Sequence, residues 1–282
     1  MTSQQQSDPA LQALSYYLNR SDEELDLSRA ALVIASAHYP SLVIDTYLKQ
    51  LAQMERTLRP PLRSAHTPLQ QVALINAYLF DELGFEGDRQ DYFDPRNSFL
   101  NEVLDRKRGI PITLSLIYLD IAQRLFLPIF PVGMPYHFFM RYETPQQQFY
   151  IDPFYGGAIL TETECFDRIS EIAGETVLYD PTYLQVTPKR IFLYRLLNNL
   201  KRHYLENNRY VQAEIVLKQL LIILPESIPN LRELGKISLQ DKRYPEALDW
   251  FQRYLDAEPN AQDAPHVVEA MSEIHRLKVA RN

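Results

Sequence analysis

Glycine and cysteine are scarce in this chain of 282 residues. Only 8 glycines stand against 19 prolines, which indicates helices separated by rigid turns and argues against a glycine-rich phosphate loop. The single cysteine, Cys165, excludes an intrachain disulfide and any zinc site built from two thiolates, and it fits a reducing compartment. The histidines have no metal-ligand spacing. We therefore expect no metal and no cofactor.

The chain also lacks long apolar runs and an excess of positive charge. No apolar run approaches the ~18 residues that a membrane-spanning helix needs. The opening segment MTSQQQSDPA has neither the basic nor the apolar region of a secretory leader. The formal net charge is −7, whereas nucleic-acid binding draws on a basic surface. These absences predict a cytoplasmic protein that binds neither membranes nor nucleic acid, and they leave its oligomeric state open.

A strongly helical pattern is present instead. Hydrophobic residues make up 46% of the sequence, which is enough for a sizeable core. Ser21 and Glu24 have the spacing of a capping box and predict a helix start, whereas Arg59-Pro60-Pro61 predicts a helix stop. Apolar periodicity predicts helices over residues 27–37, 44–58, 67–83, 112–125 and 162–172. The fourth is apolar on nearly every side, so we expect it to be buried.

The C-terminal part contains an internal repeat. Ala213 and Pro225 recur as Ala247 and Pro259, at an offset of 34 residues, and apolar positions recur with them. This period and spacing resemble the tetratricopeptide repeat, in which alanine lets paired helices approach closely and proline ends each unit. We expect a helical array over residues 189–282 that docks a protein or peptide partner.

Several separated segments resemble the SirB-type branch of the transglutaminase-like superfamily. They are the stretch from Asn97 to Ser115, the triplet Tyr136-His137-Phe138, and the run Tyr150-Ile151-Asp152-Pro153-Phe154. The early run over residues 26–35 and the C-terminal repeats also resemble that branch. Because these segments occur in the family's order, the resemblance covers most of the chain.

The resemblance implies an α+β fold that is mostly helical, with a papain/transglutaminase-like core, a small antiparallel sheet and a following tetratricopeptide-like array. An N-terminal helical region over residues 1–95 would pack on the core at 96–188, and the repeats at 189–282 would follow. Active members carry a cysteine at the N-terminus of a buried helix, a histidine that begins one strand and an aspartate that ends the next. The helix start lowers the thiol pKa, the histidine takes its proton, and the aspartate orients the histidine.

His137 and Asp152 match the family's histidine and aspartate, as a remnant of the catalytic pair. Strands are expected over residues 138–141 and 149–151, around the turn residues 144–147. With a loop of about four residues, the two side chains lie on the same face of this hairpin, ~5–7 Å apart and within reach of a hydrogen bond. A loop changed by one residue would put them on opposite faces.

The nucleophile is where the sequence departs from the family pattern. In Arg108-Gly109-Ile110-Pro111, Pro111 stands where active members have the thiol, and a proline is chemically inert. Ser115, one helical turn further on the same face, is the alternative nucleophile, although a hydroxyl needs stronger activation than a thiol. The side chain of Thr113 is expected to point away from the direction of Pro111. Cys165 follows the aspartate in chain order, against the family arrangement.

Each candidate also has a structural interpretation. The histidine–aspartate pair can hold the hairpin together, or it can keep a binding or residual catalytic role. The guanidinium of Arg108 can be a solvated or capping cation or can hold a substrate carboxylate, and Asn97 and Glu102 are expected to be structural. The candidate binding residues around the predicted cleft are Arg108, Gly109, Pro111 and Tyr136.

Three functions follow from these patterns. The first is an accessory or regulatory pseudoenzyme whose cleft around Pro111, His137 and Asp152 binds a peptide or polar ligand and whose repeats dock a protein. The second is an active hydrolase or acyl transferase that uses Ser115 or a water activated by His137. The third is a pure protein-interaction scaffold whose core is only a folded spacer.

Overall fold

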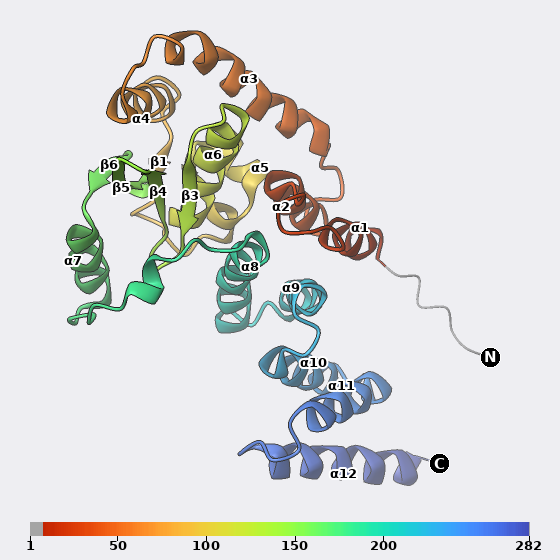
Figure 1. Ribbon diagram of the computed structural model, residues 1–282. Helices are drawn as coiled ribbons and strands as arrows, with labels where there is room; N and C mark the ends of the chain where they lie inside the picture. Colours follow the sequence, from red (N-terminus) through yellow and green to blue (C-terminus); the bar gives the residue numbers. More distant parts are fainter. Residues whose placement is uncertain (1–7, 282) are drawn as a thin grey trace. The chain divides into compact units, whose positions relative to one another are not determined.

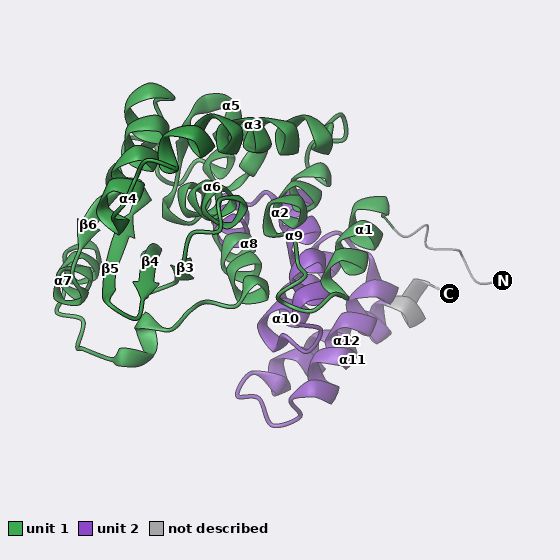
Figure 2. Cartoon of the chain, turned by 45° about the horizontal axis from the view of Figure 1, so that its top comes forward, with its two compact units in different colours: residues 1–199 green, residues 200–282 purple. Residues whose placement is uncertain are grey.

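The computed structural model describes residues 8–281, whose elements are shown in Figure 1. The chain divides into two units, residues 1–199 and residues 200–282 (Figure 2). Residues 1–7, where no secretory leader is expected, and residue 282, at the end of the expected repeat array, lie outside the described part. Within residues 8–281, no helix has both the length and the apolar character that a membrane crossing requires.

The first unit begins with four α-helices. They are α1 Pro9–Leu18, α2 Leu27–Ser36, α3 Ile44–Leu62 and α4 Pro68–Asn76, and a π-helical turn, Ala77–Glu82, follows the last. The expected helix start at Ser21 is wrong, because Ser21 Oγ only closes a turn by accepting the Glu24 N–H at 3.3 Å. Asp26 caps α2 instead. The expected stop at Arg59-Pro60-Pro61 is also wrong, since both prolines lie in the last turn of α3 and the helix continues to Leu62.

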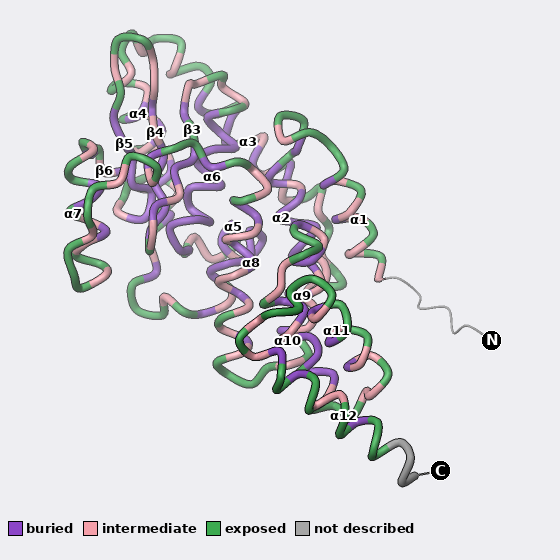
Figure 3. The backbone as a smooth tube through the Cα atoms, turned by 60° about the horizontal axis from the view of Figure 1, so that its bottom comes forward, coloured by how far each residue is buried: buried purple, intermediate pink, exposed green. Residues whose placement is uncertain are grey.

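Helix α6, Pro111–Arg124, forms the centre of the first unit. Its residues from Pro111 to Ala122 are all buried (Figure 3). It contacts α2, α3, β3 and β4, so that its sides are covered by helices and by the sheet. This burial agrees with the apolar character that the sequence shows around the whole helix.

A four-stranded antiparallel sheet, in the order β3-β4-β5-β6, packs beside α6. Its strands are β3 Ile129–Val132, β4 Phe139–Thr144, β5 Gln147–Asp152 and β6 Ala158–Leu160. A short parallel pair also joins β1, Glu86–Gly87, to β2, Arg108–Gly109, and α5, Leu100–Arg106, precedes β2. The expected α+β fold, mostly helical with a small antiparallel sheet, is thereby confirmed.

Helix α7, Glu162–Ala173, packs on β5 and β6. A complete capping box between Thr161 and Glu164 fixes its start. Its buried face contributes Cys165, Phe166 and Ile169 to an apolar cluster. Helix α7 therefore ties the outer edge of the sheet to the segment that follows it.

Helices fill the second unit, after α8, Lys189–Glu206, which begins in the first. They are α9 Tyr210–Ile223, α10 Ile228–Gln240, α11 Tyr244–Ala257 and α12 Ala264–Arg281. The repeated Ala213 and Ala247 are both fully buried, as the repeat predicts. A Cβ on Gly235 would lie 2.4 Å from the Phe251 ring, so glycine allows α10 and α11 to pack this closely.

Gly109 plays the same role between β2 and α6. A Cβ there would lie 2.8 Å from Thr113 Oγ1 and 3.0 Å from Val103 Cγ1. The Thr113 hydroxyl is held by hydrogen bonds and cannot move away at low cost. We expect Gly109→Ala to lower the free energy of unfolding by about 1–3 kcal/mol, measured by urea denaturation followed by circular dichroism. An unchanged unfolding midpoint would contradict this account of the packing.

Candidate functional site

The His137–Asp152 pair is formed across the β4–β5 hairpin. His137 Nε2 lies 3.0 Å from Asp152 Oδ1, and the two side chains are 2% and 0% exposed. The hairpin loop is shorter than expected, because Thr144 already pairs with Gln147. Shortening a loop by an even number of residues keeps the two side chains on one face, so the predicted contact is present. Its chemical role stays a prediction.

Asp152 is the centre of a larger set of contacts. Its Oδ1 also accepts the Phe154 N–H at 3.1 Å, and its Oδ2 lies 3.4 Å from Nη1 of Arg168 on α7. The hydrogen bond between Nε2 of His137 and Oδ1 of Asp152 fixes the orientation of the imidazole ring. Arg168 was not singled out from the sequence, where a charge on an amphipathic helix gives no signal of a buried partner.

The segment before His137 is held by a second arginine. Arg195, on α8, donates to the carbonyl oxygens of Met134 at 2.6 Å and His137 at 3.2 Å. Burial lowers the pKa of its guanidinium from the ordinary value. Tyr136 lies between these carbonyls with φ of 65°, a left-handed conformation, and its side chain is 59% exposed. The arginine thus anchors the loop that positions the histidine.

Aromatic side chains surround the histidine ring. Its centroid lies 4.5 Å from that of Phe139, 6.0 Å from that of Phe154 and 6.1 Å from that of Tyr155. These rings, together with the low exposure of the pair, keep bulk water away from the His137–Asp152 hydrogen bond. A ligand therefore reaches the pair only if one of the covering side chains moves.

Pro111 is the first residue of α6 and is buried. Two residues on, the Thr113 hydroxyl donates to the Asn97 carbonyl at 2.7 Å and accepts the Ile110 N–H at 3.1 Å, so both of its roles are used. Ser115 is fully buried, and within residues 8–281 its Oγ has no hydrogen-bond partner. The contact with a general base that would activate this serine is therefore missing from this conformation.

Cys165 lies in the apolar cluster of α7 and is fully buried. Burial, together with the nearby charges of Asp152 and Glu164, raises the pKa of its thiol well above the ordinary value. The thiol therefore stays protonated at neutral pH and is a poor nucleophile.

The candidate binding residues do not gather at one opening. Gly109 and Pro111 are buried, whereas the side chains of Tyr136 and Arg108 are exposed. Arg108 Nε donates to Glu86 Oε1 at 2.7 Å across the β1–β2 pair. Among these residues, Arg108 lines a pocket.

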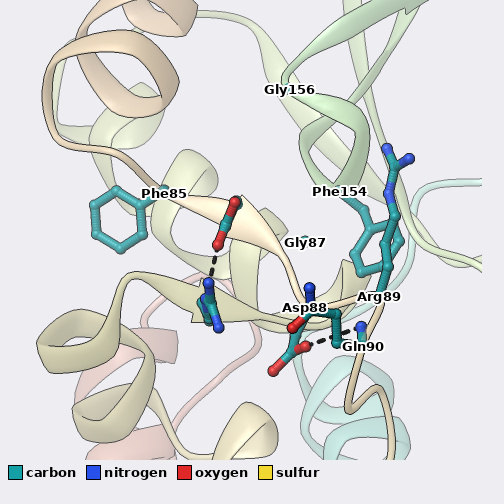
Figure 4. A pocket seen from close by; sticks show the side chains of 9 residues that line it. Phe85, Gly87, Asp88, Arg89, Gln90, Phe154 and Gly156 are labelled. Carbon is teal, nitrogen blue, oxygen red and sulfur yellow. Dashed lines mark hydrogen bonds and ion pairs between the residues drawn. The ribbon is translucent and has the colours of Figure 1, made fainter.

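That pocket has a volume of about 390 Å³ and lies beside the residues that follow Asp152 (Figure 4). In Figure 4, Phe85 lies at one end, and Phe154 with Arg89 lies at the other. Phe154 links the pocket to the pair, because its ring also contacts His137. The full lining is Phe85, Glu86, Gly87, Asp88, Arg89, Gln90, Arg108, Phe154 and Gly156.

Asn97, which is expected to be structural, lies in a buried network of hydrogen bonds. It is fully buried, and its side-chain amide donates to Asp88 Oδ2 at 3.2 Å and to the Asp91 carbonyl at 2.8 Å. Its own oxygen accepts from Arg106 at 3.2 Å. Across residues 8–281, no three His, Cys, Asp or Glu side chains are grouped so as to hold a metal ion.

Residues 45–198 match the family model described as transglutaminase-like superfamily. The chain belongs to the transglutaminase-like superfamily. Residues 200–272 match a tetratricopeptide repeat model, in agreement with the offset repeat and the helices of the second unit. The superfamily and the repeat architecture expected from the sequence are therefore confirmed.

The proteins similar to this chain differ in sequence identity and in the share of the chain that they match. A UPF0162 protein of Xylella fastidiosa (strain 9a5c) is 33% identical over 249 residues, which cover 87% of this chain and 89% of that protein. F-box only protein 21 of Mus musculus is 40% identical over 99 residues, which cover 32% of this chain and 16% of that protein. A crystal structure of menin is 12% identical with a TM-score of 0.40, over 94% of this chain and 74% of that one. The menin likeness is too remote to support an inference.

Asp152→Asn tests the contacts of the buried carboxylate. The amide keeps the shape of the side chain but removes the charge that faces Arg168, so we expect the free energy of unfolding to fall by about 1–3 kcal/mol in urea denaturation. Asp120→Asn is the matched control, since Asp120 is also buried and forms an ion pair with Arg124, one turn away on the same helix, at 2.5 Å. If Asp152→Asn lowers the free energy of unfolding by no more than Asp120→Asn does, the central place of Asp152 among these contacts is contradicted.

Proposed function

We propose that this chain is an accessory or regulatory protein of the SirB-type branch, a pseudoenzyme that binds a polar or peptide ligand with its core and a protein partner with its repeats. The observation that carries the proposal is the start of α6, where Pro111 is the buried first residue of the helix. The family resemblance expects the nucleophilic cysteine at this place. The single buried thiol fits a cytoplasmic location for such a protein.

The surroundings of the pair support a non-catalytic interpretation. Cys165 is held protonated, the Thr113 hydroxyl is fully hydrogen-bonded, and the Ser115 Oγ has no hydrogen-bond partner within residues 8–281. Acyl transfer needs a nucleophile that a neighbouring base can deprotonate. Without one, the hydrogen-bonded histidine and aspartate serve to hold the hairpin and the residues around it in position.

Two observations support a binding role for the core. The pocket next to Phe154 has a size typical of small-ligand sites and carries charged groups of both signs. A stretch of 99 residues is also similar to part of the much longer F-box only protein 21, as expected for a module that can be joined to other domains. The ligand would bind beside the pair and not on it.

The repeat unit has a pocket of its own. It has a volume of about 610 Å³ and combines apolar, acidic and basic side chains, which suits a peptide segment of a partner protein. The lining residues are Pro225, Glu226, Ile228, Leu231, Arg253, Asp256 and Ala257. We assign partner docking to this surface.

The pseudoenzyme assignment predicts that acyl transfer is absent. The full-length protein is incubated with glutamine-containing peptides and a primary amine, and released ammonia and labelled peptide are measured. We expect no turnover above buffer for either the wild type or His137→Ala. Turnover that His137→Ala abolishes while circular dichroism is unchanged would contradict the assignment, and Ser115→Ala would then separate a serine nucleophile from an activated water.

Ile228→Asp tests partner docking in the full-length chain. A charge in the repeat pocket should reduce capture of a cross-linked partner about tenfold, since burying such a side chain contributes about 1.5–3 kcal/mol. Val211→Asp is the control, because Val211 is 70% exposed and does not line the pocket. Capture is quantified by mass spectrometry, and equal capture by the two variants would exclude this pocket as the docking surface.

A further inference from the structure

We propose that the pocket next to Phe154 binds a carboxylate group, either of a small acid or of a peptide C terminus, and that Arg89 is its principal ligand. The inference rests on the ligand-binding role proposed for the core and names the chemistry of that ligand.

The carboxylates in the lining are already compensated. Glu86 pairs with Arg108 at 2.7 Å. Asp88 is buried, and it accepts the N–H groups of Gln90 and Asp91 and the Asn97 amide. These contacts, with Arg106 nearby, keep the pKa of Asp88 below its ordinary value, although its burial acts in the opposite direction. Both carboxylates therefore already have hydrogen-bond or ion-pair partners.

Arg89 is the second cationic residue of the pocket lining, and unlike Arg108 it forms no ion pair with a carboxylate of the described residues. Within residues 8–281, no Asp or Glu lies within ion-pair distance of it, and its side chain is exposed at the pocket. Its contact is with the ring of Tyr155, whose centroid lies 4.4 Å from the guanidinium carbon. A cation–π contact holds the side chain but leaves its N–H donors free for an incoming acceptor.

The ring of Tyr155 also contacts a second guanidinium group, that of Arg168. Arg168 lies 3.9 Å from the centroid of the same ring, and its Nη1 reaches Asp152 at 3.4 Å. The pocket arginine, the tyrosine, the second arginine and the buried aspartate thus form a continuous series of contacts that ends at His137. Arg89 is consequently oriented before a ligand arrives, which reduces the entropy lost on binding.

A carboxylate fits this pocket better than a phosphate. The planar fork of arginine pairs with a carboxylate through two parallel hydrogen bonds. Glu86 and Asp88 also lie in the lining, so a doubly charged phosphate meets more repulsion than a singly charged carboxylate. Phe154 also lines the pocket and lies next to Arg89 in Figure 4, so that its ring can contact an apolar group attached to the acid.

The test uses the full-length protein and isothermal titration calorimetry with N-acetyl-phenylalanine. N-acetyl-phenylalanine amide lacks the charge, inorganic phosphate is the competing anion, and an acetylated tripeptide ending in phenylalanine represents a peptide terminus. We expect the acid or the tripeptide to bind at least about tenfold more tightly than the amide and the phosphate. Whichever of the two binds more tightly identifies the source of the carboxylate.

Variants then assign the arginine. Arg89→Ala should weaken binding of the preferred acid about tenfold or more, and Arg89→Lys should restore part of it, because the charge returns without the fork. Arg20→Ala is the matched control: Arg20 also lies over tyrosine rings, at 5.5 Å from Tyr16, but outside the pocket. Binding should be unchanged in that variant.

The outcomes separate this inference from the proposed function. Equal binding of acid and amide would overturn carboxylate recognition while leaving a binding role for the core intact. Acid binding that survives Arg89→Ala would overturn the assignment to Arg89. Binding of neither acid nor tripeptide would overturn the inference altogether, whereas the acyl-transfer assay alone decides whether the chain is a pseudoenzyme.

Discussion

The carboxylate of Asp152 is the point on which the first unit's functional region depends. A fully buried carboxylate is costly unless its oxygens are hydrogen-bonded and its charge is compensated. Asp152 meets that requirement with His137, the Phe154 N–H and Arg168, which belong to three different parts of the fold. Each partner is therefore held where the carboxylate needs it, and the hairpin, the turn after β5 and helix α7 share one anchor.

On the proposed function, the same contacts give the histidine and the aspartate a structural role that does not depend on a nucleophile. In an acyl-transfer enzyme, the aspartate orients the histidine toward a thiol. Here α6 begins with a proline, which suits the first turn of a helix because it has no N–H to satisfy. The hydrogen bond between His137 and Asp152 joins two parts of the hairpin whether or not a nucleophile faces it, so the proposed pseudoenzyme would still have a structural reason to keep both side chains.

Sequence patterns predicted the features that depend on local periodicity. The buried helix, the shared face of His137 and Asp152 and the repeat offset all follow from the spacing of residues along one or two neighbouring elements. Local signals failed at two helix ends. Asp26 caps α2 in place of Ser21, and α3 continues through Pro60 and Pro61.

Arg168, Arg195 and the pocket around Arg89 were beyond prediction for a different reason. Their partners are far away along the chain, and a charged residue on a helix usually belongs to a solvated face. Only the packing of α7 and of the first part of α8 within the first unit brings these guanidinium groups to Asp152 and to the His137 loop. Electrostatic contacts between distant segments carry no periodic signature that a single sequence can reveal.

The two-residue tip of the β4–β5 hairpin restricts how this chain can diverge. Because side chains alternate between the faces of a strand, insertions at the tip are compatible with the site only in steps of two residues. A single inserted residue would need a bulge to restore the alternation. Length variation among homologous hairpins should therefore be even-numbered wherever the buried aspartate and its histidine occur together.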